Sequence, residues 1–212
     1  MFKTIMYKIS SRYRERVEEQ FYDKKSKWME RVIGKEHDMV FHAIFPYEIG
    51  GPVDVYIYPK KGFGTTLGTK EMVSWGSQEC LPFDGQYYEV AMVTKHDVSN
   101  DENSPFSKAM IRFRKLMTMA ARYSGQAVLK SLDTVEMPTG EEGEETACAV
   151  FYEINRKSRS FIDGIPFTVQ YIIEVHPSEM LYARNHGTEK LITLMKEKGV
   201  FPFSDLDRNP VV

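Results

Sequence analysis

Charged residues near the end of the chain are the ones whose types and spacing could do chemistry. Asp205, Asp207 and Arg208 lie in one short stretch, with apolar residues on both sides. An arginine guanidinium can form two parallel hydrogen bonds with a carboxylate, so such a cluster can either clamp a chain segment or hold a polar ligand. We favour a clamp that fixes the C-terminal segment to the domain, and we keep a partner-binding surface as the alternative for these three residues.

Asp54 and Trp75 are two further candidates for contact with a partner. Asp54 lies between two valines of a predicted strand, and a covered carboxylate needs a partner, for which an arginine is the natural choice. Trp75 ends another predicted strand. If the protein is instead a hydrolase-like enzyme or a small-molecule-binding protein, Asp54, Trp75, Glu174 and His176, together with Asp205, would line a cleft with perturbed pKa values.

The sequence predicts no metal site, because its potential ligands lack the spacing that metal sites show. These ligands are His37, His42, His96, His176, His186, Cys80 and Cys148. The glutamates between 141 and 145 lack the alternating oxygens of a calcium loop, so we interpret them as a solvated loop. The basic segment 156–159 is interpreted as a second loop.

No motif for a cofactor or a catalytic nucleophile is present. The glycine-rich segment 61–70 lacks the Gly-Lys-Ser/Thr step of a phosphate loop and precedes a strand, so it is interpreted as a tight turn. Cys80 precedes a Leu-Pro turn without the local signature of a catalytic cysteine, which favours a structural thiol. We therefore expect no cofactor and no catalytic residues.

Composition limits the class of protein. The chain has 212 residues, of which 42% are hydrophobic, so it can bury a sizeable core. Its formal charge of −2 gives no electrostatic sign of binding to nucleic acid or to an anionic membrane. No apolar run is long enough for a membrane span. Two distant cysteines and no export signal predict free thiols and a cytoplasmic location.

Hydrophobic periodicity predicts an α+β fold, a single domain over residues 1–212 with a mixed β-sheet flanked by helices. Helices are expected at 11–32, at 105–124 after the N-cap Ser104, and in a final pair capped by Ser178 and Thr188. Strands are expected at 39–45, 53–58, 65–75, 86–94, 128–135, 147–154 and 167–175. Asp84-Gly85 predicts a tight turn, and the strands of the first half are expected to be antiparallel neighbours.

Three segments resemble one known family. They are FPYEIGGPVDVYIYPKKG at 45–62, TTLGTKEMVSWG at 65–76, and the last strand and helices with EVHPSEM, LITLMKEKGV and SDLDRNPVV. In this order they resemble the suppressor-of-fused-like domain, and the resemblance covers about residues 12–212. In the second segment the family's threonine-glycine-methionine-serine pattern is loosened to Thr69, Met72, Ser74 and Gly76.

The resemblance implies a protein-binding domain and not an enzyme. In animals this family restrains a transcription factor in Hedgehog signalling by clamping an extended peptide, and in bacteria similar single domains are regarded as immunity proteins that neutralise toxins. The chain has the size of one such domain, so the expectation is a non-enzymatic, immunity-type module that binds a toxin. An exposed sheet edge would supply main-chain hydrogen bonds to the partner.

Overall fold

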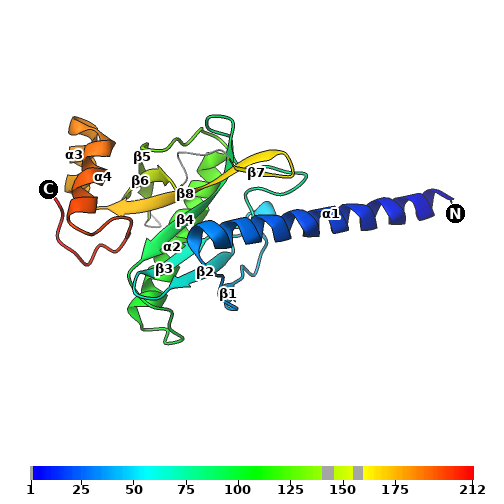
Figure 1. The fold of residues 1–212 in the computed structure, drawn as a ribbon, viewed down its shortest axis with the longest axis horizontal. Helices are drawn as coiled ribbons and strands as arrows, with labels where there is room; N and C mark the ends of the chain where they lie inside the picture. The colour runs from blue at the N-terminus through cyan, green and yellow to red at the C-terminus, as the bar shows by residue number, and fades with distance from the viewer. Residues whose placement is uncertain (1, 140–145, 155–159) are drawn as a thin grey trace.

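One mixed β-sheet runs through the molecule, and four helices pack on its faces and at one end (Figure 1). The computed structural model describes residues 2–139, 146–154 and 160–212. The helices are α1 Phe2–Ile33, α2 Pro105–Ser124, α3 Pro177–His186 and α4 Thr188–Glu197, with a short 3-10 helix at Tyr47–Ile49. The strands are β1 Val40–Phe41, β2 Val55–Lys60, β3 Gly64–Gly68, β4 Tyr87–Thr94, β5 Thr134–Pro138, β6 Thr146–Glu153, β7 Ser160–Ile162 and β8 Ile165–Val175. The predicted α+β class is confirmed.

Strand β8 joins the two halves of the sheet. The strand order is β1-β2-β3-β4-β8-β6-β5, and β7 pairs with the beginning of β8. β1 to β4 are antiparallel neighbours, as predicted, whereas β8 is parallel to β4 and antiparallel to β6. Gln170 and Tyr171 of β8 pair with both β4 and β6; Gln170 is buried and Tyr171 is partly buried.

The core has two parts. The larger part lies between the sheet and the helices α1 and α2, and includes Phe21, Trp28, Phe113 and Phe167. The smaller part lies between the ends of β6 and β8 and the helix pair α3 and α4. Figure 1 shows this pair at one end of the sheet, while the first half of α1 extends away from the other end.

Several predicted strands are shorter than expected, because side chains take over the hydrogen bonds of the main chain. The strand predicted at 65–75 ends at Gly68, since the N–H groups of Met72 and Val73 donate to the Glu89 carboxylate. The strand predicted at 39–45 ends at Phe41, and the Ala43 N–H beyond it donates to Asp54.

Other boundaries also move. The strand predicted at 128–135 begins only at Thr134, after Leu132, whose positive φ of 77° interrupts extended chain. The N-caps of α3 and α4 are His176 and Gly187, each one or two residues before the predicted Ser178 and Thr188. The predicted loops at 141–145 and 156–159 lie outside the described residues.

Strand β7 was not predicted from the sequence. Asp163 and Gly164 both have positive φ and connect Ile162 to Ile165 as a two-residue hairpin loop. Asp-Gly is the typical sequence of such a loop, so the signal for β7 was present. It was missed because the strand is only three residues long.

A buried ion pair fixes α1 to the sheet. Lys25 and Glu89 are both buried, and the Lys25 Nζ lies 2.8 Å from the Glu89 Oε1. The same ammonium group donates to the carbonyls of Lys70 and Val73. The second Glu89 oxygen accepts a hydrogen bond from the Thr69 hydroxyl. These contacts satisfy both charges and connect α1, the segment after β3, and β4.

In the described part of the chain, no helix is long and apolar enough to cross a membrane.

Lys25→Met should lower the free energy of unfolding by about 3–5 kcal/mol, because it leaves the buried Glu89 carboxylate without a counter-charge. Urea denaturation measures this loss, and the exposed Lys27→Met on the same helix is the control. Adding Glu89→Gln to Lys25→Met should recover part of the stability. Equal losses in Lys25→Met and Lys27→Met would show that the ion pair is not what holds the helix.

Candidate protein-binding site

The residues singled out in the sequence fall in three separate places. Glu174, His176 and the tail cluster lie together where β8 meets α3, Asp54 precedes β2, and Trp75 lies beside α1. A single cleft that unites Asp54, Trp75, Glu174 and His176 is therefore not formed. The assignment of Asp54, Trp75, Asp205, Asp207 and Arg208 to a partner stays a prediction.

The tail cluster is bound to the domain itself. Asp205 accepts hydrogen bonds from the Thr94 hydroxyl at 2.6 Å and from the Lys95 N–H at 2.7 Å. Asp207 is exposed and pairs with the Lys95 ammonium at 2.8 Å. Arg208 donates from two nitrogens to the two oxygens of Glu179, at 2.6 and 2.8 Å. This arrangement is the geometry of a clamp.

Glu179 is the buried carboxylate that Arg208 binds in this clamp. Its carboxylate also accepts the N–H groups of His176 at 2.8 Å and Val211 at 2.9 Å, so it caps α3 and holds the tail at once. Burial alone would raise the pKa of Glu179, but the hydrogen bonds from Arg208, Val211 and His176 outweigh it and lower that pKa.

Glu174 and His176 are also engaged in structural contacts. The buried Glu174 carboxylate forms a forked pair with the Arg112 guanidinium, with Nε 2.8 Å from Oε2. The His176 Nε2 lies 2.9 Å from the Arg208 carbonyl oxygen. Neither side chain is free to serve as the acid or base of the alternative cleft.

Asp54 has a different partner from the arginine that we expected. Its carboxylate lies 2.7 Å from the His42 Nδ1 and accepts the Ala43 N–H, while its own N–H donates to Glu71 at 3.0 Å. His42 suffices as the partner of the Asp54 carboxylate, because this carboxylate keeps some contact with solvent.

The neighbouring Glu71 is the strongest sign of possible acid–base chemistry. Burial, followed by the nearby Asp54 charge, raises the pKa of Glu71 to about 7. Catalysis would also require a cavity for a substrate, and neither Glu71 nor Asp54 lines any of the grooves described below. Among the described residues, no group of three His, Cys, Asp or Glu side chains could hold a metal ion.

Trp75 lines a groove beside the projecting part of α1. The groove has a volume of about 580 Å³, and Glu15, Glu18 and Tyr22 of α1 form its other wall. The Trp75 ring is half-exposed, so it is available for contact with another molecule.

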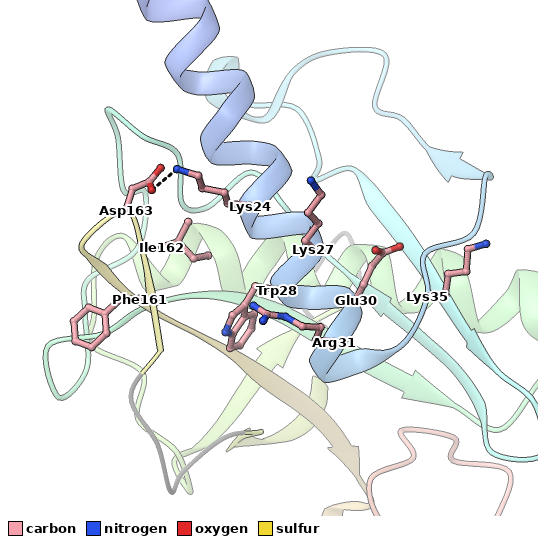
Figure 2. A pocket seen from close by; sticks show the side chains of 9 residues that line it. All are labelled: Lys24, Lys27, Trp28, Glu30, Arg31, Lys35, Phe161, Ile162 and Asp163. Carbon is pink, nitrogen blue, oxygen red and sulfur yellow. Dashed lines mark hydrogen bonds and ion pairs between the residues drawn. The ribbon is translucent and has the colours of Figure 1, made fainter.

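A groove that sequence reasoning missed has the better chemistry for binding a partner. It lies between the second half of α1 and the β7–β8 hairpin, and its volume is about 740 Å³ (Figure 2). We call it the basic groove. The residues that line it are Lys24, Lys27, Trp28, Glu30, Arg31, Lys35, Phe161, Ile162 and Asp163.

Among the described residues, most cations of the basic groove have no acidic partner. Lys24 pairs with Asp163 at 2.5 Å, as the dashed line in Figure 2 shows. Within the part of the chain that the structure describes, Lys27, Arg31 and Lys35 have no carboxylate within ion-pair distance. The groove therefore carries net positive charge on a protein whose formal charge is −2.

The hairpin beside these cations offers an apolar side chain and a strand edge. Phe161 is 59% exposed, whereas Trp28 is packed edge-on against Phe167. Phe161 lies opposite Pro166, which has no N–H, and the pair next to the turn is Ile162 with Ile165. Hydrogen-bonded and non-bonded pairs alternate along antiparallel strands, so the N–H and C=O of Phe161 point away from β8. An extended chain can pair with them.

The signal for this groove was partly visible in the sequence. Lys24, Lys27 and Arg31 recur at helical spacing and so share one face of α1. The opposite wall could not be foreseen, because β7 was missed. The described residues that line the groove include no cysteine, serine or histidine.

Comparison with known proteins gives a match to solved structures only. No family model matches the chain, and no curated protein matches its sequence. The crystal structure of the Sufu–Fu complex matches with a TM-score of 0.64 and 12% identity, over 92% of each chain. The chain has the suppressor-of-fused-like fold.

Two further structures share the suppressor-of-fused-like fold. A putative SUFU homologue from Neisseria gonorrhoeae FA 1090 matches with a TM-score of 0.53 and 14% identity, over 93% of this chain and 98% of that chain. Drosophila Suppressor of Fused matches with a TM-score of 0.57 and 12% identity, and this chain covers 46% of its length. The family resemblance read from the sequence is thus confirmed at the level of the fold.

Arg208→Ala should lower the free energy of unfolding by about 1–3 kcal/mol near neutral pH, because it removes the partner of a buried carboxylate. Since the folded pKa of Glu179 lies below its ordinary value of 4.5, the stabilisation is present above that value and is lost as the pH falls through the lowered pKa. Urea unfolding at several pH values should therefore show a difference from the parent that shrinks in acid.

The exposed Asp207→Asn is the matched control and should change stability by less than about 0.5 kcal/mol. If the unfolding midpoints of Arg208→Ala and the parent coincide, the interpretation of Arg208 as a structural clamp is wrong. The cluster of Asp205, Asp207 and Arg208 would then become the leading candidate for the interface with a partner.

Proposed function

We propose that this chain is a non-enzymatic protein-binding module that holds an acidic, extended segment of a protein partner in the basic groove. The observation that carries the proposal is a set of three cations, Lys27, Arg31 and Lys35, that have no ion-pair partner among the described residues and lie near strand β7, whose Phe161 is exposed. The fold supports it, because one structure with the same fold is described as the Sufu–Fu complex.

The chemistry of the groove favours an acidic partner. Carboxylates of the partner would take the place of water at Lys27, Arg31 and Lys35, with hydrogen bonds strengthened by charge. Complementary charges also increase the rate of encounter and disfavour basic competitors.

The free strand edge favours an extended partner. The main chain of such a segment can pair with the N–H and C=O of Phe161, while an apolar side chain packs on the Phe161 ring. A helical segment would leave these main-chain groups unpaired.

The enzyme alternative has weaker support. It rests on Glu71, whose pKa is raised to about 7, but Asp54, Trp75 and the pair of Glu174 and His176 lie in three separate places. A binding function needs no such convergence.

We further propose that the partner is a toxin, which this module neutralises as an immunity protein of the cytoplasm. The match over 98% of a bacterial homologue's chain supports a single-domain, bacterial type of protein. Cys80 and Cys148 are buried free thiols, which fits a reducing compartment.

Fluorescence anisotropy with a short fluorescein-labelled peptide of alternating valine and glutamate tests the groove. We expect Lys27→Glu with Arg31→Glu to weaken binding by about tenfold or more, because two attractive charges become repulsive. Lys190→Glu with Lys198→Glu, at exposed sites on and just after α4, changes the net charge equally and should leave binding unchanged. Peptide N-methylated on alternate residues should bind less tightly, since it cannot pair with β7.

Equal binding by both double variants, or by a peptide with lysine in place of glutamate, would show that the groove is not the site. The toxin assignment has its own test, in which the chain is co-expressed with the product of the neighbouring gene. The parent chain should relieve growth arrest and the variant of Lys27 and Arg31 should not. A neighbouring product that causes no arrest, or an arrest that the parent does not relieve, would contradict the assignment.

A further inference from the structure

A second surface of the molecule exposes several large apolar side chains close together in the sequence. Between β1 and β2, the segment 44–51 carries Ile44, Phe45 and Ile49, with exposed fractions of 93%, 66% and 73%. Single exposed hydrophobic residues are ordinary, but three on one short loop indicate a surface that another molecule covers. We call this segment the apolar loop.

The apolar loop is held in its outward conformation by the main chain. The carbonyl of Pro46 accepts the N–H groups of Ile49 at 3.2 Å and Gly51 at 2.9 Å. A Cβ at Gly51 would lie 1.7 Å from the Phe45 carbonyl oxygen, so only glycine allows this closure. Arg122 of α2 donates to the carbonyls of Gly50 and Gly51. The main chain of the loop is thus held from Pro46 to Gly51.

A groove along the outer face of α2 continues from the apolar loop. It begins at Pro52, has a volume of about 460 Å³, and follows α2 from Met110 to Arg122. Met110, Ile111 and Met119 give it an apolar floor, and Ile111 is 64% exposed. We call it the α2 groove.

The rim of the α2 groove is basic. Arg114, Lys115 and Arg122 line it, and none of the described residues that line it is acidic. Arg122 and Arg114 donate to neutral carbonyls, those of Gly51 and Val53 among them, and neither forms an ion pair with a carboxylate of the described residues. One guanidinium nitrogen of Arg114 is buried without a hydrogen-bond partner in the described structure. An occupant with carboxylates would complement this rim.

The main chain of α2 determines what form the occupant takes. The N–H and C=O groups along this face are bonded within the helix, so they can offer nothing to an extended chain. A buried occupant must therefore satisfy its own main-chain hydrogen bonds, which a helix does. The face from Met110 to Arg122 is about 18 Å long, enough for roughly three turns of a partner helix.

We propose that the α2 groove and the apolar loop together form a second docking surface, for an acidic amphipathic helix of a protein partner. Its leucine-like face lies on Met110, Ile111 and Met119, and its carboxylates face Arg114 and Arg122. This surface shares no residue with the basic groove, so either site can fail in experiment while the other stands.

The probe is a fluorescein-labelled, helix-stapled peptide of about 16 residues, with leucines on one face and glutamates beside them. We expect the parent protein to raise its fluorescence anisotropy, and Ile111→Glu to weaken binding by about tenfold or more. Leu181→Glu on α3 is the matched control, because Leu181 is equally exposed, at 60%, and should leave binding unchanged. The same peptide with lysines in place of glutamates should bind much less tightly.

Hydrogen exchange with the bound probe should protect the apolar loop and leave β7 unprotected. Circular dichroism melting checks that both variants are folded, and Phe45→Ser, on the loop, is a second variant that should weaken binding if Ile111→Glu unfolds. Absence of binding by the parent, equal binding by Ile111→Glu and Leu181→Glu, or equal binding of the lysine peptide would overturn the proposal. Sedimentation that shows a dimer dissociated by Ile111→Glu would assign the surface to a second copy instead.

Discussion

The buried ion pair between Lys25 and Glu89 holds together the part of the fold on which the basic groove depends. Lys25 binds the carbonyls of Lys70 and Val73 as well as Glu89, so one ammonium group fixes α1 against the segment after β3 and against β4. A charge in the interior is tolerated only when all its hydrogen bonds are made, as they are here. The rotation of α1 about its axis is set at the same time, because Lys25 has to face inward.

That rotation decides what α1 presents to the outside. With Lys25 and Trp28 inward, Lys24, Lys27 and Arg31 lie along the groove wall. Glu89 is buried and contacts no partner itself. Through Lys25 it nevertheless determines which cations of α1 a partner meets. A second buried charge holds the tail at the opposite end of the sheet. There the Glu179 carboxylate accepts hydrogen bonds from Arg208 and from two main-chain N–H groups.

Much of the fold could be predicted from local pattern. The N-cap Ser104 and the turn at Asp84-Gly85 are where the sequence places them, since each depends on chemistry within a few residues. The strand ends could not be predicted, because Glu89 and Asp54 bind main-chain N–H groups that are distant in sequence. Lys25 lies between Phe21 and Met29 at helical spacing, on the buried face of α1, but its partner Glu89 is 64 positions away, so the pair could not be predicted from local pattern.

The candidate sites show the same limit. The tail cluster was found because its residues are adjacent, and the basic groove was missed because its walls come from α1 and from the β7–β8 hairpin, far apart in the chain. The α2 groove is likewise built from a loop and a helix that meet only after folding. Residue types predict what a surface can bind, but only the assembled fold brings the two sides of a groove together.

The central place of β8 has a consequence for how the protein reaches its folded state. Tyr87 on β4 lies beside Phe167 on β8, and some 80 residues separate them in the chain. During synthesis, β1 to β4 therefore leave the ribosome long before the strand that completes their sheet. Until β8 arrives, the unpaired edge of β4 is open to other chains, and a contact between such distant segments makes folding slow. A fusion or a truncation beyond α2 would prolong the exposure of the β4 edge. The second half of the chain therefore protects the first half from pairing with other chains.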